Sequence, residues 1–209
     1  MLLEAERALI VHHAGRLRPD GLVVGTAGNL SIRVGDLVAI TPSSVDYDEL
    51  DSGQVCVVGL DGEIVAGERT PSSELPMHLA VYHATDAAAI VHTHAPYATT
   101  LATVVDELPA IHYMIAELGG PVRVAPYATF GSDELAASVM DALDGRSAVL
   151  LGSHGTLTIG GSLAQAYWRS VLLEWLATLY YRARHLGDPR LLPGEEIERV
   201  ADRLRAIRC

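Results

Sequence analysis

Lysine is missing from this sequence of 209 residues, and all 15 of its basic residues are arginine. A lysine amine forms Schiff bases with carbonyl substrates, anchors pyridoxal phosphate and completes the Walker A phosphate loop. A chain without lysine performs none of this chemistry. The absence therefore narrows the reaction classes before any motif is considered.

Cysteine and long apolar runs are also scarce. The two cysteines, Cys56 and Cys209, are too few for a disulfide framework, so we expect both to be free thiols. No segment reaches the ~20 uninterrupted apolar residues that span a bilayer. The first residues carry acids where a secretory signal carries basic residues. These features predict a cytoplasmic protein.

Positive charge is in deficit as well. The 26 acidic residues against 15 basic ones give a formal net charge of -11. No basic run of the kind that follows a phosphate backbone occurs in the sequence. We therefore expect neither nucleic acid nor a membrane as a partner.

Hydrophobic residues make up 49% of the sequence, which is enough to form one full core, and we expect a single domain over residues 1–209. The first third predicts mainly antiparallel strands, and helices and strands then alternate. Strands are expected at 29–34, 37–40, 55–58, 64–65, 88–92, 122–125, 148–151 and 156–159, and helices at 2–18, after Ser73, after Pro96, from Ser132, at 162–185 and from Gly194. This order indicates an α/β fold, with helices packed around a mixed, largely antiparallel sheet.

Three histidines follow apolar strand patterns. His92 and His94 close the run 88–91, and alternate residues of a strand point to the same side. His154 follows the apolar stretch 148–151, so we expect it to leave a neighbouring strand at the same edge of the sheet. Three imidazoles without a cysteine are typical of a catalytic zinc, which keeps one position open for substrate.

Hydroxyl-rich loops provide a candidate anion site. Glu74 follows Ser72 and Ser73 at a predicted helix start, and small polar loops lie at 25–31 and 41–44. Backbone N–H groups and hydroxyls can hold a phosphate without lysine. His78, His83 and His112 lie outside the three-histidine set, and we interpret them as packing groups or as groups that support metal ligands.

Seven motifs occur in the same order as in the class II aldolase/adducin family, and the chain resembles its L-fuculose-1-phosphate aldolase branch. They extend through nearly the whole sequence and begin at residues 25, 40, 71, 92, 110, 125 and 153: GTAGNLS, ITPS, PSSE, HTH, AIHYM, APYATFG and SHG. The resemblance implies a three-layer α/β/α fold, a homotetramer and active sites between subunits.

The resemblance also implies a role for individual residues. It assigns one Zn²⁺ per subunit to His92, His94 and His154, with Glu74 as acid/base and additional ligand. Tyr113 from a neighbouring subunit would be the second catalytic residue. The substrate phosphate would bind to Thr26, Asn29, Ser43, Ser44, Ser72 and Ser73.

The sequence departs from the family pattern at two points. Ser44 stands where the aldolases usually have glycine after the Thr-Pro-Ser/Thr of the second phosphate loop. The tyrosine-bearing C-terminal tail of the best-known members has no counterpart here. The first departure affects how the backbone approaches the phosphate, and the second affects closure over the aldehyde.

The chemistry agrees with the resemblance. Cleaving a carbon–carbon bond next to a ketone leaves an enediolate, which is stabilised by an iminium from lysine or by a Lewis-acid metal. Without lysine, only the metal route remains. The expected reaction is reversible cleavage of L-fuculose 1-phosphate or a 5-deoxypentulose 1-phosphate to dihydroxyacetone phosphate and an aldehyde.

Other functions on the same fold remain open at this stage. Pentulose-5-phosphate 4-epimerases, sugar-acid phosphate decarboxylases and thioribulose-phosphate dehydratases belong to the same family. The epimerases carry Asp where Glu74 stands. The adducin head is a non-catalytic module without the metal histidines, and the three histidines here disfavour that role.

Overall fold

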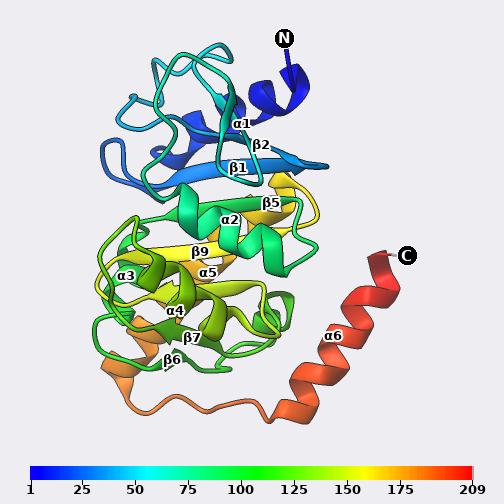
Figure 1. The fold of residues 1–209 in the computed structure, drawn as a ribbon. Coiled ribbons are helices and arrows are strands. Elements are labelled where there is room, and N and C mark those ends of the chain that lie inside the picture. The colour runs from blue at the N-terminus through cyan, green and yellow to red at the C-terminus, as the bar shows by residue number, and fades with distance from the viewer. Residues whose placement is uncertain (209) are drawn as a thin grey trace.

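A nine-stranded mixed sheet forms the centre of the protein, in a computed structural model that describes residues 1–208. The strand order is β4-β3-β2-β1-β5-β9-β8-β7-β6, and every neighbouring pair is antiparallel except β7 and β8. In Figure 1, β1 and β2 lie toward one end of the sheet, β7 and β6 lie toward the other end, and β5 and β9 lie between them. Cys209, one of the two expected free thiols, lies outside the described residues, and Cys56 is free and buried.

The elements follow the order expected from the sequence. The strands are β1 (Asn29–Val34), β2 (Leu37–Ile40), β3 (Cys56–Gly59), β4 (Ile64–Ala66), β5 (Ala89–Thr93), β6 (Glu107–Leu108), β7 (Val122–Ala125), β8 (Ala148–Leu151) and β9 (Gly155–Gly160). The helices are α1 (Glu4–Leu17), α2 (Leu75–Ala84), α3 (Pro96–Leu101), η1 (Tyr113–Leu118), α4 (Asp133–Leu143), α5 (Leu163–Leu186) and α6 (Gly194–Arg208).

Serine caps determine where two of the helices begin. The Ser132 side chain accepts a hydrogen bond from the Leu135 N–H at the start of α4. The Ser162 side chain does the same for the Gln165 N–H at the start of α5. A hydroxyl at this position satisfies a backbone donor that the helix itself leaves unpaired.

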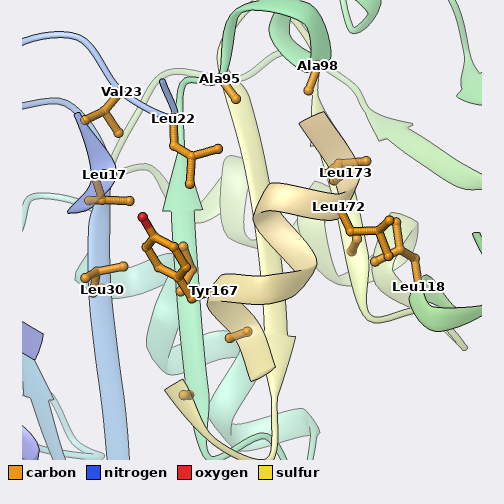
Figure 2. Packing of buried hydrophobic residues seen from close by; sticks show 14 of the residues in the cluster. Leu17, Leu22, Val23, Leu30, Ala95, Ala98, Leu118, Tyr167, Leu172 and Leu173 are labelled. Atoms are coloured by element: carbon orange, nitrogen blue, oxygen red, sulfur yellow. The ribbon is translucent and has the colours of Figure 1, made fainter. Parts of the chain in front are cut away.

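Helices cover both faces of the sheet, which confirms the α/β/α prediction. The larger apolar cluster lies between the sheet and α1, α3, α5 and η1, with α6 packed on η1, and the smaller one lies between the sheet and α2 with α4. Figure 1 shows α2 and α4 in front of the sheet and α5 behind it. In the larger cluster, Tyr167 projects from α5 toward Leu17, Leu22 and Leu30 (Figure 2).

One expectation about strand order is wrong. We expected the strands that precede His94 and His154 to be neighbours, but β9 lies between β5 and β8. Both strands run antiparallel to β9, so their C-terminal ends still reach the same edge of the sheet. β9 enters this position because β8 turns back tightly through Gly152–His154 and pairs with the strand that follows.

Candidate active site

The three histidines meet at the edge where β5 and β8 end. His92 lies in β5 and is fully buried, His94 follows β5 directly, and His154 lies in the β8–β9 turn. The ring centroids of the three imidazoles are 4.9 to 5.0 Å apart. A side chain at Gly155 would bring a Cβ to 2.3 Å from the Thr93 carbonyl oxygen, so glycine lets the turn approach β5 this closely.

Glu74 comes to this group from the start of α2, which covers the face of the sheet toward which His92 and its pairing partner Asn29 point. It immediately precedes α2, whose first turn contains Pro76, as the sequence indicated. Its Oε2 is 2.9 Å from His92 Nε2, and its Oε1 is 3.3 Å from His154 Nε2. The ligand atoms of Glu74 and of the three histidines all lie within 4.8 Å of one another.

The donor set fits a divalent metal ion. His92 Nδ1 is 2.8 Å from the Thr156 carbonyl oxygen, so Nδ1 carries the proton and donates it. In the neutral ring, Nε2 then has a lone pair and no proton to donate. It lies 3.0 Å from His94 Nε2 and also faces the Glu74 carboxylate. Within residues 1–208, no group hydrogen-bonds the buried Glu74 Oε1. Buried acceptors that converge without donors are stabilised by a shared cation.

The electrostatics keep the donor atoms in their metal-binding protonation states. Burial alone would raise the pKa of the Glu74 carboxyl, but His92, His154 and the Asn29 amide outweigh it and hold that pKa well below its ordinary value. Burial, together with His92 and His154, lowers the pKa of His94 to about 4. Burial also lowers the pKa of His154. At neutral pH Glu74 is therefore an ionised carboxylate, and His94 and His154 are neutral imidazoles.

A pocket of about 340 Å³ opens beside this group. Its walls include the residues expected to hold phosphate, together with Glu74 and two of the histidines: Thr26, Asn29, Ser43, Ser44, Ser72, Ser73, Glu74, His94 and His154. Among the described residues that line it, none is lysine or arginine. The structure thus brings the three hydroxyl-rich loops together, and an anion in the pocket would be bound by hydroxyls and backbone N–H groups.

Backbone contacts explain why these loops converge. Pro42 and Pro71 form an isolated antiparallel bridge, with Ser43 N–H donating to the Thr70 carbonyl and Ser72 N–H to the Thr41 carbonyl. A Cβ at Gly28, which has a φ of 78°, would lie 2.7 Å from the His92 carbonyl oxygen. The loop that contains Gly28 is therefore packed directly against the strand that carries His92.

Asn29 has a second set of contacts that the sequence did not indicate. Its side chain is almost fully buried, with Nδ2 donating to Glu74 Oε2 at 2.9 Å and Oδ1 2.5 Å from His78 Nε2. His78 is buried, in agreement with its interpretation as a packing or supporting group. His83 is exposed and His112 is half-buried.

Two aromatic residues of the pocket were missed. Tyr127 and Phe130 line it and are 67% and 64% exposed, and their only sequence signal was the motif that begins at Ala125. Tyr113, the expected second catalytic residue, is 50% exposed at the start of η1 and is not part of the pocket of its own chain.

Comparisons with known proteins agree with this geometry. Residues 8–181 match the family profile described as the Class II Aldolase and Adducin N-terminal domain. The chain is 44% identical over 204 residues to a 5-deoxy-D-ribulose 1-phosphate aldolase from Bacillus thuringiensis serovar kurstaki, a match that covers 96% of each chain. It is 40% identical to the L-fuculose phosphate aldolase of Escherichia coli K12, over 88% of this chain and 87% of the other.

Solved structures give the same result. An L-fuculose 1-phosphate aldolase superposes with a TM-score of 0.94 at 41% identity, covering 96% of both chains. The L-fuculose-1-phosphate aldolase from Thermus thermophilus superposes with a TM-score of 0.77 at 31% identity, covering 90% of this chain and all of the other.

Proposed function

The chain belongs to the class II aldolase and adducin family, and on this premise we propose that it is a zinc-dependent aldolase acting on a ketose 1-phosphate. The reaction would cleave the C3–C4 bond of the ketose and release dihydroxyacetone phosphate and an aldehyde. The relatives from Bacillus thuringiensis and Escherichia coli are named as sugar-phosphate aldolases, which supports a lyase over the other activities of the family.

One observation carries the proposal: a group of three histidines and one glutamate borders an anion pocket without lysine or arginine. The group supplies donors for a divalent ion, and the pocket supplies hydroxyls and backbone N–H groups for a phosphate. A non-catalytic module has no use for this combination. We therefore prefer an enzyme to an adducin-like interaction module.

His92, His94, His154 and Glu74 would hold the metal. When bound, it would supply Lewis-acid stabilisation of the negative charge that develops beside the ketone as the C3–C4 bond breaks. Three imidazoles and a carboxylate suit Zn²⁺ best, and Co²⁺ or Mn²⁺ would be accepted less well.

The remaining steps belong to side chains of the protein. Thr26, Ser43 and Ser72, with the neighbouring loop residues, would fix the phosphate and so align C3 with Glu74. Oε2 of Glu74 accepts from Asn29, so Oε1 is the oxygen available to exchange a proton with C3. In the condensation direction, Tyr113 would donate its phenolic proton to the aldehyde oxygen while the C3 electron pair forms the bond to C4, and cleavage would reverse this step.

Tyr113 lies outside its own pocket, so its proposed role requires a second subunit. We therefore include a homotetramer with active sites between subunits in the proposal. Exposed aromatic side chains on η1 and α5, among them Tyr113 and Trp175, provide apolar surface for such contacts. A cytoplasmic location remains a prediction from the sequence; among the helices of residues 1–208, none has the length and apolar character of a membrane span.

Of the two substrates considered, we favour 5-deoxy-D-ribulose 1-phosphate, which would give acetaldehyde. Identity and coverage are higher for the relative named after this substrate than for the Escherichia coli L-fuculose phosphate aldolase. A further relative from Rhodospirillum rubrum, 41% identical, is named as a 5-methylthioribulose-1-phosphate/5-deoxyribulose-1-phosphate aldolase.

The test is dihydroxyacetone phosphate release from 5-deoxy-D-ribulose 1-phosphate and from L-fuculose 1-phosphate, each with and without chelator. We expect release that chelation abolishes and Zn²⁺ restores, with a higher kcat/KM for the deoxypentulose. Release from neither substrate would overturn the aldolase proposal in favour of an epimerase, decarboxylase or dehydratase. Release that survives complete metal removal would overturn the role of the metal.

A further inference from the structure

A chain of buried hydrogen bonds leads from Glu74 into the interior between α2 and β1. Asn29 Nδ2 is 2.9 Å from Glu74 Oε2, and Asn29 Oδ1 is 2.5 Å from His78 Nε2. His78 Nδ1 is 2.6 Å from Ser31 Oγ, which is 2.7 Å from the Tyr82 hydroxyl. All five side chains are buried, and Ser31 and His78 are completely inaccessible to solvent.

The side-chain periodicities of β1 and α2 place these residues in two rows. Asn29 and Ser31 are alternate residues of β1 and therefore point to the same side of the sheet. Glu74, His78 and Tyr82 are spaced by four residues along α2 and its N-terminal cap, so they share one face of the helix. The two rows face each other, which gives an unbroken relay from Tyr82 to Glu74.

The hydrogen bonds of this relay have only one consistent direction. An ionised Glu74 only accepts, so Asn29 must direct its NH₂ toward Glu74 and its carbonyl oxygen toward His78. His78 Nε2 then carries the proton, and Nδ1 accepts from the Ser31 hydroxyl. Ser31 in turn accepts from the Tyr82 hydroxyl. A reversed Asn29 amide would place two acceptors 2.9 Å apart with no proton between them.

Burial supports the neutral form of His78 that this direction requires. Complete burial is the main cause that lowers the pKa of His78, to about 3. A neutral ring has one donor and one acceptor, as the relay demands. Each donor in the series thus points toward the carboxylate.

Packing alone does not account for these polar groups. The same face of α2 contributes Met77 and Val81 to the smaller apolar cluster, and further apolar side chains would hold the helix to the sheet equally well. A fully satisfied buried network instead fixes the orientation of its members. In this network, the terminal member that lies at the pocket is Glu74.

We infer that His78, Ser31 and Tyr82 are positioning residues that lock the Asn29 amide and thereby hold the Glu74 carboxylate with Oε1 free for proton transfer. This inference rests on the acid/base role proposed for Glu74. It also gives Asn29 a function besides phosphate binding. The relay acts on the orientation of Glu74, and of its five members only Asn29 and Glu74 line the pocket.

The decisive comparison is His78→Met against His78→Gln. Methionine keeps the volume but has no donor for Asn29, whereas the glutamine amide can replace the Nε2–H. The assay is solvent deuterium exchange into dihydroxyacetone phosphate at the carbon that was C3 of the ketose, which reports proton transfer without cleavage. We expect exchange and kcat to fall about 10–100-fold in His78→Met, with KM and metal content little changed, and glutamine to restore most of the loss.

Tyr82→Phe is the milder variant, should His78→Met fail to fold. It removes only the terminal hydroxyl of the relay, and we expect exchange to fall about 2–5-fold. Tyr167→Phe is the matched control, because it also removes a buried tyrosine hydroxyl but one that donates to Asp20 on the opposite side of the sheet. Exchange in the control should equal that of the wild type.

A ¹⁵N spectrum of the imidazole groups gives a readout independent of activity. In the metal-free wild type we expect the neutral Nε2–H tautomer for His78, with an Nδ1 signal that shifts in Ser31→Ala. An Nδ1–H tautomer would overturn the inference, as would full exchange in His78→Met or equal losses in His78→Met and His78→Gln. Absence of cleavage and exchange in the wild type would instead overturn the proposed function, and the tautomer would still decide the direction of the relay.

Discussion

Glu74 has two carboxylate oxygens with different surroundings. Oε2 contacts Asn29 and His92, whereas Oε1 has no hydrogen-bond partner within residues 1–208. We expect Glu74→Gln to keep bound metal, because three histidine ligands remain, but to lose proton exchange at C3, because an amide does not take up and release the proton. The measurements are metal content and deuterium exchange.

His94→Ala is the comparison variant for this experiment. Loss of one imidazole from the group should remove metal and activity together. Exchange retained in Glu74→Gln would contradict the acid/base role, and metal lost in Glu74→Gln would make Glu74 an essential ligand.

Ser44 occupies a backbone conformation that favours glycine. Its φ is 59°, in the left-handed region, and glycine is the usual residue of the family pattern at this position. We expect Ser44→Gly to raise the free energy of unfolding by about 0.5–1 kcal/mol, measured as a higher urea midpoint at constant m-value. Ser52→Gly, at a serine whose φ is not positive, should lower the midpoint instead. A lower midpoint for Ser44→Gly would show that contacts of the serine hydroxyl stabilise the fold by more than the left-handed backbone conformation costs.

Helix α3 depends on a side chain from α5. Glu174 accepts hydrogen bonds from the Tyr97 and Ala98 N–H groups at 2.9 and 2.8 Å, at the first turn of the helix that follows His94. Burial raises the pKa of Glu174, while the two N–H donors oppose this shift. We expect Glu174→Ala to lower the free energy of unfolding by about 1–3 kcal/mol, because it leaves buried donors without partners.

Urea unfolding of Glu174→Ala would measure this loss. Glu198→Ala is the control, since Glu198 is exposed on α6 and its removal should change stability by less than about 0.5 kcal/mol. Equal midpoints for the two variants would mean that water replaces Glu174 at the helix N-terminus without cost.

The elements also show what the sequence could and could not predict. The hairpin of β1 and β2 and the start of α4 at Ser132 were predictable because alternation and capping are local signals. β6 was missed because it has two residues, and η1 was missed because a 3-10 turn has no lasting periodicity. The position of β9 depends on pairing between distant segments, which no local pattern contains.

The same distinction applies to the candidate site. His92, His94 and His154 could be grouped because strand parity and strand ends place them at one edge. The contact of Asn29 with both Glu74 and His78 could not, because it requires α2 to be docked on β1. Tyr127 and Phe130 lie on an irregular loop, where no periodicity in the sequence predicts which way a side chain points.

For the molecule as a whole, the metal would join three separate parts of the fold. The candidate ligands lie at the start of α2, at the end of β5 and in the β8–β9 turn. We expect chelation to lower Tm by about 5–10 °C relative to protein at a metal concentration of about 100 times Kd, where binding contributes about 2.7 kcal/mol. Calorimetry with and without chelator checks this value, and His94→Ala should show no difference between the two conditions.

Acid should destabilise the metal-free protein through its buried neutral histidines. In the unfolded chain His78 titrates near 6.5, but in the fold its pKa is about 3, so below pH 6.5 the unfolded state binds the additional proton. Stability therefore falls as pH decreases, by about 2 kcal/mol between pH 7 and 5 for this one group. Urea unfolding at the two pH values should show a smaller decrease in His78→Gln, and an equal decrease would contradict the assignment to His78.

The insertion of β9 between β5 and β8 also determines when β5 can pair with its two neighbours during synthesis. β5 pairs with β1 on one side and with β9 on the other, and β9 follows it by more than sixty residues. As the ribosome extends the chain from its N-terminus, β5 has an unpaired edge until residues 155–160 have emerged. His154 immediately precedes this segment, so the last of the four candidate metal ligands emerges together with the strand that completes the pairing of β5.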